Sequence, residues 1–250
     1  MRPISARIDD LDLSVFAAVP SQTSDAEKRS LLAVQRAVAR RFGSYHYLEI
    51  GSHLGGSLQP HVRDNRCTLI DSIDLRPQTA PDDRSKDFVK VFKENSTQRM
   101  LENLRSMGEG SLDKIRTYDM DSKDVPREAI ARPLHLAFID GEHTRAAVIR
   151  DYELCRTNLA EGGVILFHDL YIVFPAIVEI IDGLKKQGVQ VLPAKLERSV
   201  FGLFFDPALV HGDETLSASY RDNLPTFNRL LRRYRLKNML PRLLREALRS

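Results

Sequence analysis

The sequence predicts an α/β domain built around a mostly parallel sheet. Short apolar runs alternate along the chain with segments of helical periodicity, which is the pattern of consecutive βαβ units. Polar side chains follow directly after most of the apolar runs. The last two runs have no helical segment between them, so they predict an antiparallel hairpin at one edge of the sheet.

Each element is predicted by local spacing and by its cap. Ser24 and Glu27 form a capping box, and apolar residues then recur at helical spacing until Gly43. We expect strands at 45–50, 67–75, 114–118, 134–139 and 164–167, and two more near 189–192 and 200–205. We expect helices at about 25–41, 95–107, 144–159 and 175–186, with a polar loop over 76–91.

Composition excludes several classes of protein. The 250 residues are 42% hydrophobic and 28% charged, which is ordinary for a globular chain. No apolar run reaches the roughly 18 residues of a membrane span. Two distant cysteines, Cys67 and Cys155, exclude a disulfide framework and a cysteine-rich zinc site. The first residues contain no apolar signal segment, so we expect a cytoplasmic protein.

The net charge of +3 is distributed unevenly. Residues 227–250 contain eight Lys or Arg and one Glu, so the rest of the chain carries a net charge of −4. Leucines recur there at near-helical spacing, and Pro241 predicts two short, basic, amphipathic helices. Two alternatives stay open: the tail docks on the core or a sister subunit, or it lies on an anionic membrane surface. No aromatic stacking platform accompanies the basic residues, so we expect no nucleic-acid partner.

The candidate site residues lie where predicted strands end. Ligands of an open parallel sheet collect at the carboxyl ends of its strands, so these residues are expected to converge. They are Glu49 with the turn 51–57, then Asp74, the stretch 119–121, Asp140, and the pair His168 and Asp169.

The turn after the first strand reads GSHLGGS from Gly51 to Ser57. Glycine at this place lets a ligand approach the backbone, although the spacing is not the G-x-G-x-x-G of dinucleotide sites. Glu49 would repel a pyrophosphate and suits a cationic or amino-bearing ligand. Asp74 ends the second strand, where a carboxylate can accept hydrogen bonds from ribose hydroxyls. The alternatives are a plain strand-to-helix turn and a solvated aspartate.

Asp140 and Asp169 end strands that neighbour each other in a regular sheet. Gathered carboxylates suit a hard divalent cation, above all Mg²⁺, which can polarise a substrate hydroxyl. His143 is placed to take the proton, and the alternative is a residue that caps the following helix. His168 is a weaker metal candidate because imidazole suits zinc or iron better, and the alternative is a structural histidine.

Four segments together carry a family resemblance: LEIGSHLGGS, SIDLRP, FIDGEH and GGVILFHD. They resemble the class I S-adenosylmethionine-dependent methyltransferases over about residues 44–206. More narrowly, they look like the metal-dependent O-methyltransferases that act on sugar hydroxyls, such as the macrocin and mycinamicin enzymes. The resemblance implies a Rossmann-like fold, with a mostly parallel seven-stranded sheet, an antiparallel edge hairpin and helices on both faces. We expect a methyltransferase domain at 1–222 with an N-terminal helical extension, followed by the basic tail 223–250.

The resemblance assigns roles to individual residues. It implies that S-adenosylmethionine contacts Glu49, Gly51, Ser52, His53, Ser57, Asp74, Asp121, Ser122 and Asp140, with Asp119 a rival for the adenine position. It implies that Asp140 and Asp169 hold the metal and that His143 is the catalytic base. Where this family often has a second acidic residue beside the last metal aspartate, this chain has His168, a further candidate ligand.

The expected activity is therefore methylation of a sugar hydroxyl on a glycan or glycosylated natural product, assisted by Mg²⁺. The acceptor pocket is expected to come from the first 22 residues, the loops 76–91 and 170–174, and the tail. A metal-dependent hydrolase built on Asp140, His168 and Asp169 is an alternative that leaves the glycine turn unexplained. A non-catalytic binding protein on the same fold is another, which the intact motif set disfavours. The tail adds the expectation of contact with the inner membrane face or of a homo-oligomer.

Overall fold

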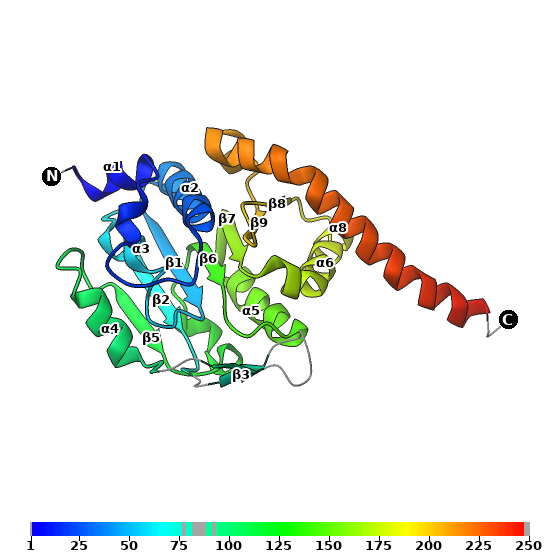
Figure 1. Ribbon diagram of the computed structural model, residues 1–250, viewed down its shortest axis with the longest axis horizontal. Helices are drawn as coiled ribbons and strands as arrows, with labels where there is room; N and C mark the ends of the chain where they lie inside the picture. The colour runs from blue at the N-terminus through cyan, green and yellow to red at the C-terminus, as the bar shows by residue number, and fades with distance from the viewer. Residues whose placement is uncertain (1, 77–78, 82–88, 92–93, 248–250) are drawn as a thin grey trace.

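The computed structural model describes residues 2–76, 79–81, 89–91 and 94–247. A seven-stranded sheet in the order β5-β2-β1-β6-β7-β9-β8 forms its centre (Figure 1). The strands are β1 (Tyr45–Ile50), β2 (Cys67–Ile73), β5 (Ile115–Tyr118), β6 (Leu134–Ile139), β7 (Leu159–Phe167), β8 (Leu192–Lys195) and β9 (Phe201–Phe204). The first five pair in parallel, and β9 pairs antiparallel with both β7 and β8. The expected parallel sheet with an antiparallel edge pair is confirmed.

Helices cover both faces of the sheet. They are α1 (Ile4–Asp9), α2 (Asp25–Phe42), α3 (Gln59–Arg63), α4 (Thr97–Arg105), α5 (Arg145–Asn158), α6 (Leu170–Lys186), α7 (Ala208–His211) and α8 (Glu214–Ala247). Helices α1 to α4 and α7 bury apolar residues in a core on one face, and α5 and α6 do so on the other. Three short 3₁₀ helices (Leu13–Phe16, Ser122–Asp124 and Arg127–Ala129) lie in the connections.

Helix α2 begins as its sequence predicts. The Ser24 amide donates to the Glu27 carboxylate at 2.8 Å, and the Ser24 hydroxyl accepts from the Glu27 amide. At the other end, Gly43 adopts a positive φ of 75°. The capping box fixes the first turn, and with it the position of the Glu27 side chain.

Two predicted boundaries are wrong by several residues. Helix α6 begins at Leu170 and contains Pro175 rather than starting there. Leu170, Val173 and Phe174 are all buried, so packing of this first turn outweighs the hydrogen bond that proline cannot make. Strand β7 begins at Leu159, before the two glycines, because Leu159 pairs with Leu134 of β6.

Two further differences arise at the sheet edge and in the 76–91 loop. Strand β8 lies three residues later than predicted, in the register that pairs Leu192 with Phe204. It tolerates Pro193 because it is an edge strand. The loop contains a small hairpin of β3 (Thr79–Pro81) and β4 (Val89–Val91), and the rest of its predicted course lies outside the described residues.

The C-terminal segment is one helix and not two. Helix α8 runs without interruption from Glu214 to Ala247 and includes Pro241. The expected domain boundary after residue 222 therefore falls inside this helix. Leu248, which belongs to the predicted leucine pattern, lies outside the described residues. Among the described residues, no helix is long and apolar enough to cross a membrane.

Candidate active site

Backbone hydrogen bonds gather the predicted site residues at one edge of the sheet. The Gly51 amide donates to Ile73 of β2, and the Asp140 amide donates to Ile50 of β1. The His168 amide donates in turn to Ile139 of β6 at 3.0 Å. The ends of β2, β1, β6 and β7 are thereby held side by side, as a parallel sheet requires.

Gly51 is the residue on which this arrangement depends. Its φ is +91°, and a Cβ atom at this position would collide with the carbonyl oxygen of Asp140. Only glycine allows β1 to turn away so close to the end of β6. The glycine turn and Asp140, the first candidate metal ligand, therefore form one structural unit.

A pocket opens beside this unit. Six of the residues predicted to contact the cofactor line it, namely Gly51, His53, Asp74, Asp121, Ser122 and Asp140. Glu142 and Asp151 also line it, and Arg150 adds one basic side chain. Because carboxylates predominate, the pocket suits a positively charged ligand better than a phosphate.

Asp74 is held firmly at the rim of this pocket. Its carboxylate accepts from the His53 amide at 2.8 Å and from the Arg76 amide at 2.7 Å. The Arg76 guanidinium lies 3.3 Å from Asp74 Oδ2, and Arg76 also donates to the His53 carbonyl oxygen at 2.6 Å. Asp74 thus ties the glycine turn to the end of β2. Asp119, its neighbour through Arg76, does not line the pocket.

Three residues predicted to contact the cofactor do not line the pocket. Glu49 is fully buried, accepting from the Tyr47 hydroxyl at 2.6 Å and from the Ser57 hydroxyl. Ser52 is also buried, with its hydroxyl 2.5 Å from that of Ser72. Burial raises the pKa of Glu49 to about 7, against the hydrogen bonds from Ser57 and Tyr47 that lower it. Glu49 therefore supports the glycine turn through its hydrogen bond with Ser57 and does not line the pocket.

Asp151 on α5 is a pocket residue that the sequence analysis missed. It is 2% exposed and accepts a hydrogen bond from the Ser122 hydroxyl. Burial raises its pKa to about 7, while the hydrogen bond from Ser122 lowers it. A signal existed in the sequence, because this acid lies at helical spacing from the apolar residues Ala147 and Val148.

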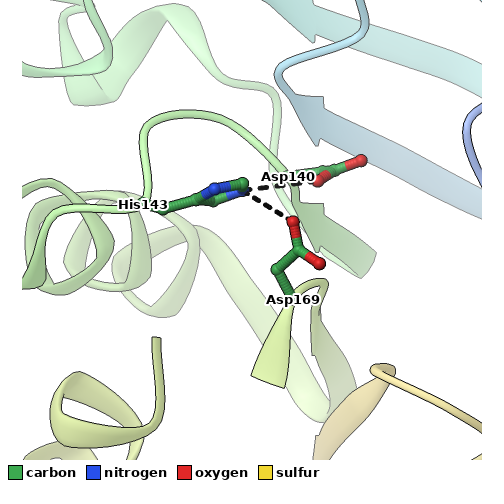
Figure 2. A group of neighbouring side chains, drawn as sticks. All are labelled: Asp140, His143 and Asp169. Carbon is green, nitrogen blue, oxygen red and sulfur yellow. Dashed lines mark ion pairs between the residues drawn. The ribbon is translucent and has the colours of Figure 1, made fainter. Parts of the chain in front are cut away.

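Asp140, which lines the pocket, converges with His143 and Asp169 (Figure 2). His143 Nε2 lies 3.8 Å from Asp140 Oδ1 and 3.5 Å from Asp169 Oδ2. The side chain of Thr144, and not that of His143, accepts the capping hydrogen bond from the first turn of α5. Asp169 adopts a left-handed φ of 48° directly before α6, a conformation that costs energy outside glycine.

These three residues fit a divalent cation. One ligand atom from each lies within 4.8 Å of the others, and they are partly or fully buried. Two carboxylates supply the hard oxygen ligands that Mg²⁺ prefers, and the imidazole adds a nitrogen ligand that Mn²⁺ also accepts.

His168 lies next to this group but faces elsewhere. Its Nδ1 atom is 3.1 Å from Asp140 Oδ1, and its Nε2 atom is 3.4 Å from Glu27 Oε1. Glu27 also accepts from the amide and hydroxyl of Ser199. The contact of Glu27 with His168 could not be predicted from the sequence, which indicated Glu27 only as the last residue of a capping box.

The positive charge of His168 compensates the negative charges of Asp140 and Glu27. Burial lowers the pKa of His168, but the charge of Asp140, hydrogen bonds to Asp140 and Glu27, and the charge of Asp169 together raise it to about 10. Burial likewise works against ionised Asp140, yet His168 and His143 hold its pKa well below the usual range. We therefore describe His168 as an imidazolium between two carboxylates.

An open sheet of this order, with a glycine turn after its first strand and an acidic pocket at its carboxyl edge, has the Rossmann-like fold of the class I S-adenosylmethionine-dependent methyltransferases. Residues 48–170 match the family model described as a methyltransferase domain. No curated protein sequence matches the chain.

Solved structures share the fold at low sequence identity. The O-methyltransferase NovP is 15% identical, with a TM-score of 0.61 over 80% of this chain and 98% of its own. The calicheamicin methyltransferase CalS11 is 16% identical, with a TM-score of 0.55 over 80% and 91%. MycE, from mycinamycin biosynthesis, is 13% identical, with a TM-score of 0.51 over 79% of this chain and 54% of its own.

Proposed function

We propose that the protein transfers the methyl group of S-adenosylmethionine to a hydroxyl oxygen of a sugar, on a glycan or a glycosylated natural product. The observation that carries the proposal is the double position of Asp140. This residue lines the acidic pocket and also belongs to the group with His143 and Asp169. A methyl donor in the pocket and a hydroxyl at the group would therefore be neighbours.

The methyl group of the sulfonium is already activated, so the protein must bring an oxygen nucleophile into line with it. Gly51 and Asp74 hold the donor side of the site, and Asp140 marks the boundary to the acceptor side. His143 Nε2 faces the same space as the carboxylates and takes the hydroxyl proton as the oxygen attacks. The methyl–sulfur bond breaks as the methyl–oxygen bond forms, leaving S-adenosylhomocysteine.

Asp140 and Asp169 would hold a divalent cation, which would supply Lewis acidity and orientation to a substrate hydroxyl, and His143 would then act as the base and not as a ligand. The position of His168 supports this division of work. As a cation beside Asp140 and Asp169, it offsets part of the negative charge of the two carboxylates. It fixes the orientation of Asp140 through Nδ1 and is assigned no step in the transfer.

Two comparisons support methyl transfer to an oxygen of a natural product. NovP is described as an O-methyltransferase, and MycE was solved with Mg, S-adenosylhomocysteine and mycinamycin VI. At this level of identity they support the proposal through the fold they share with this chain. The segment before α2 would help to form the acceptor side, because Pro20 and Ser21 lie against Gly56 of the glycine turn.

Calorimetry with S-adenosylmethionine and a methyl-transfer screen on glycans test the proposal. We expect the cofactor to bind, and activity to disappear with EDTA and return with Mg²⁺ or Mn²⁺. Asp140→Asn and Asp169→Asn should each be nearly inactive. Transfer that persists in chelator would contradict the metal assignment. The hydrolase and the non-catalytic alternatives predict, respectively, no cofactor binding and binding without transfer to any acceptor.

A further inference from the structure

The C-terminal half of α8 extends away from the body of the protein (Figure 1). The earlier part of the helix is well anchored. Phe227 is buried, and the Tyr234 ring meets Phe174 of α6 with centroids 5.7 Å apart. Arg235 donates to Asp182 of α6 at 2.6 Å. Beyond this contact, Figure 1 shows the helix continuing past α6.

The anchored part of α8 also carries basic residues that are exposed, namely Arg229, Arg232, Arg233 and Lys237. In the part of the chain that the structure describes, none of these four pairs with an acidic residue. They form an unneutralised basic surface along the anchored part of α8.

Leu236 lies on the same outward side of α8 as Arg229 and Arg233, since these positions recur at spacings of four and three in a helix of about 3.6 residues per turn. In the sequence, Leu240, Leu243 and Ala247 follow at the same spacing. The anchoring positions 227, 230 and 234 lie on roughly the opposite side. Leu236, at the start of the apolar stretch, is 52% exposed.

We propose that this outward side of α8 docks on an anionic phospholipid bilayer. The apolar stretch would lie in the boundary of the acyl chains, and the arginines would meet lipid phosphates. From Leu236 to Ala247 the helix is only about 18 Å long, too short to cross a bilayer and suited to lie in its surface. This proposal goes beyond the methyl transfer itself, since it concerns the surface on which the protein binds its acceptor.

The charge distribution of the chain favours an anionic bilayer over a second copy of the chain as the partner of this surface. Residues 227–250 carry eight basic residues and one acidic residue, whereas the rest of the chain is net negative. An anionic surface attracts the tail and repels the body, so the molecule docks with the tail toward the bilayer. Two outward sides paired in parallel would instead set Arg229 and Arg233 against the same residues of the partner copy.

Sedimentation of the full chain with vesicles tests the proposal. We expect it to pellet with phosphatidylcholine vesicles containing about a third phosphatidylglycerol, and to stay in the supernatant with phosphatidylcholine alone. Arg232→Gln with Arg233→Gln should lower the partition coefficient by about 25-fold, at about fivefold for each charge. Leu236→Gln with Leu240→Gln should lower it at least tenfold, because the apolar face is lost.

Two full-length controls separate the docking surface from general effects. Arg99→Gln with Arg105→Gln removes two exposed charges from α4 and should leave vesicle binding unchanged. Leu236→Met with Leu240→Met keeps the apolar face and should also keep binding. Circular dichroism and cofactor calorimetry verify that each variant is folded.

Three outcomes would overturn the proposal. One is no sedimentation with the anionic vesicles, and another is equal sedimentation of every variant. The third is that the glutamine variants change the mass in solution at unchanged vesicle binding, which would identify a second copy as the occupant. Binding to RNA that the arginine pair abolishes and the leucine pair leaves intact would likewise replace the bilayer with nucleic acid.

Discussion

Glu27 Oε1 lies 3.4 Å from His168 Nε2, which joins the first turn of α2 to the end of β7. On the far side of the ring, His168 Nδ1 meets Asp140 at 3.1 Å. Glu27 thus reaches the candidate metal group through one imidazole. Residues that contact a metal ligand without touching the metal orient that ligand, and replacing them lowers metal affinity or activity.

Replacing Glu27 by Gln should reduce turnover about 10- to 100-fold, with little change in cofactor affinity. The amide can still accept from the Ser24 backbone, so the cap survives, but the charge facing His168 is lost. Steady-state kinetics beside calorimetry measures both quantities. Ser24→Ala is the matched control: it weakens the same cap at a cost of about 1 kcal/mol in stability and should leave turnover intact. Equal turnover in Glu27→Gln and wild type would contradict the positioning role.

Asp74→Ala should weaken S-adenosylmethionine binding by about 1.5–3 kcal/mol in calorimetry, the range for hydrogen bonds to a charged group. The same change frees the His53 amide, so Asp74→Asn, which keeps an acceptor, should lose less. Asp119→Ala is the control, because Asp119 lies nearby without lining the pocket. An unchanged affinity for Asp74→Ala would remove its ribose assignment.

His143→Ala should lower the methyl-transfer rate by about 10²–10⁴-fold and leave cofactor affinity near that of the wild type. The physical reason is the loss of the group that takes the hydroxyl proton. His211→Ala, on the exposed surface of α7, serves as the control. His168→Ala should do less harm than His143→Ala. A loss below about tenfold for His143→Ala would leave this residue with a structural role only.

The contribution of Glu49 to the stability of the unliganded protein should fall as the pH rises from about 5 to 8. The folded pKa of Glu49 is raised from 4.5 to about 7, so its stabilising contribution is complete below pH 4.5 and disappears as the pH passes 7. The contribution at stake is about 3 kcal/mol. Asp151, with a pKa also raised to about 7, adds a change of the same sign.

Urea unfolding of Glu49→Gln at several pH values measures this contribution. Because glutamine does not titrate, the variant should lose less stability across the interval than the wild type, by about 3 kcal/mol. The slope that is left should come from Asp151 and from His168, whose pKa is raised to about 10, and Asp151→Asn provides the reciprocal comparison. Identical pH profiles for Glu49→Gln and the wild type would mean that Glu49 is ionised throughout.

Much of the fold follows from local sequence. Alternating apolar runs and helical segments predicted the seven strands, and the capping box predicted where α2 begins. Boundaries were wrong where distant contacts outweigh local preference. Pro175 and Pro241 each indicated a helix end, but both lie inside helices. At Pro175, burial of the preceding apolar turn explains the difference.

The sequence by itself determined which residues reach the carboxyl edge of the sheet, because strand ends and glycine turns are local features. It could place Gly51, Asp74, Asp140 and Asp169 there without any coordinates. Only the tertiary structure decided which of these groups meet, since those distances depend on register between strands and on helices from elsewhere in the chain. Register sets Asp140 against Gly51, and packing of α2 brings Glu27 to His168. No periodicity encodes either contact, because each joins segments that are far apart in the sequence.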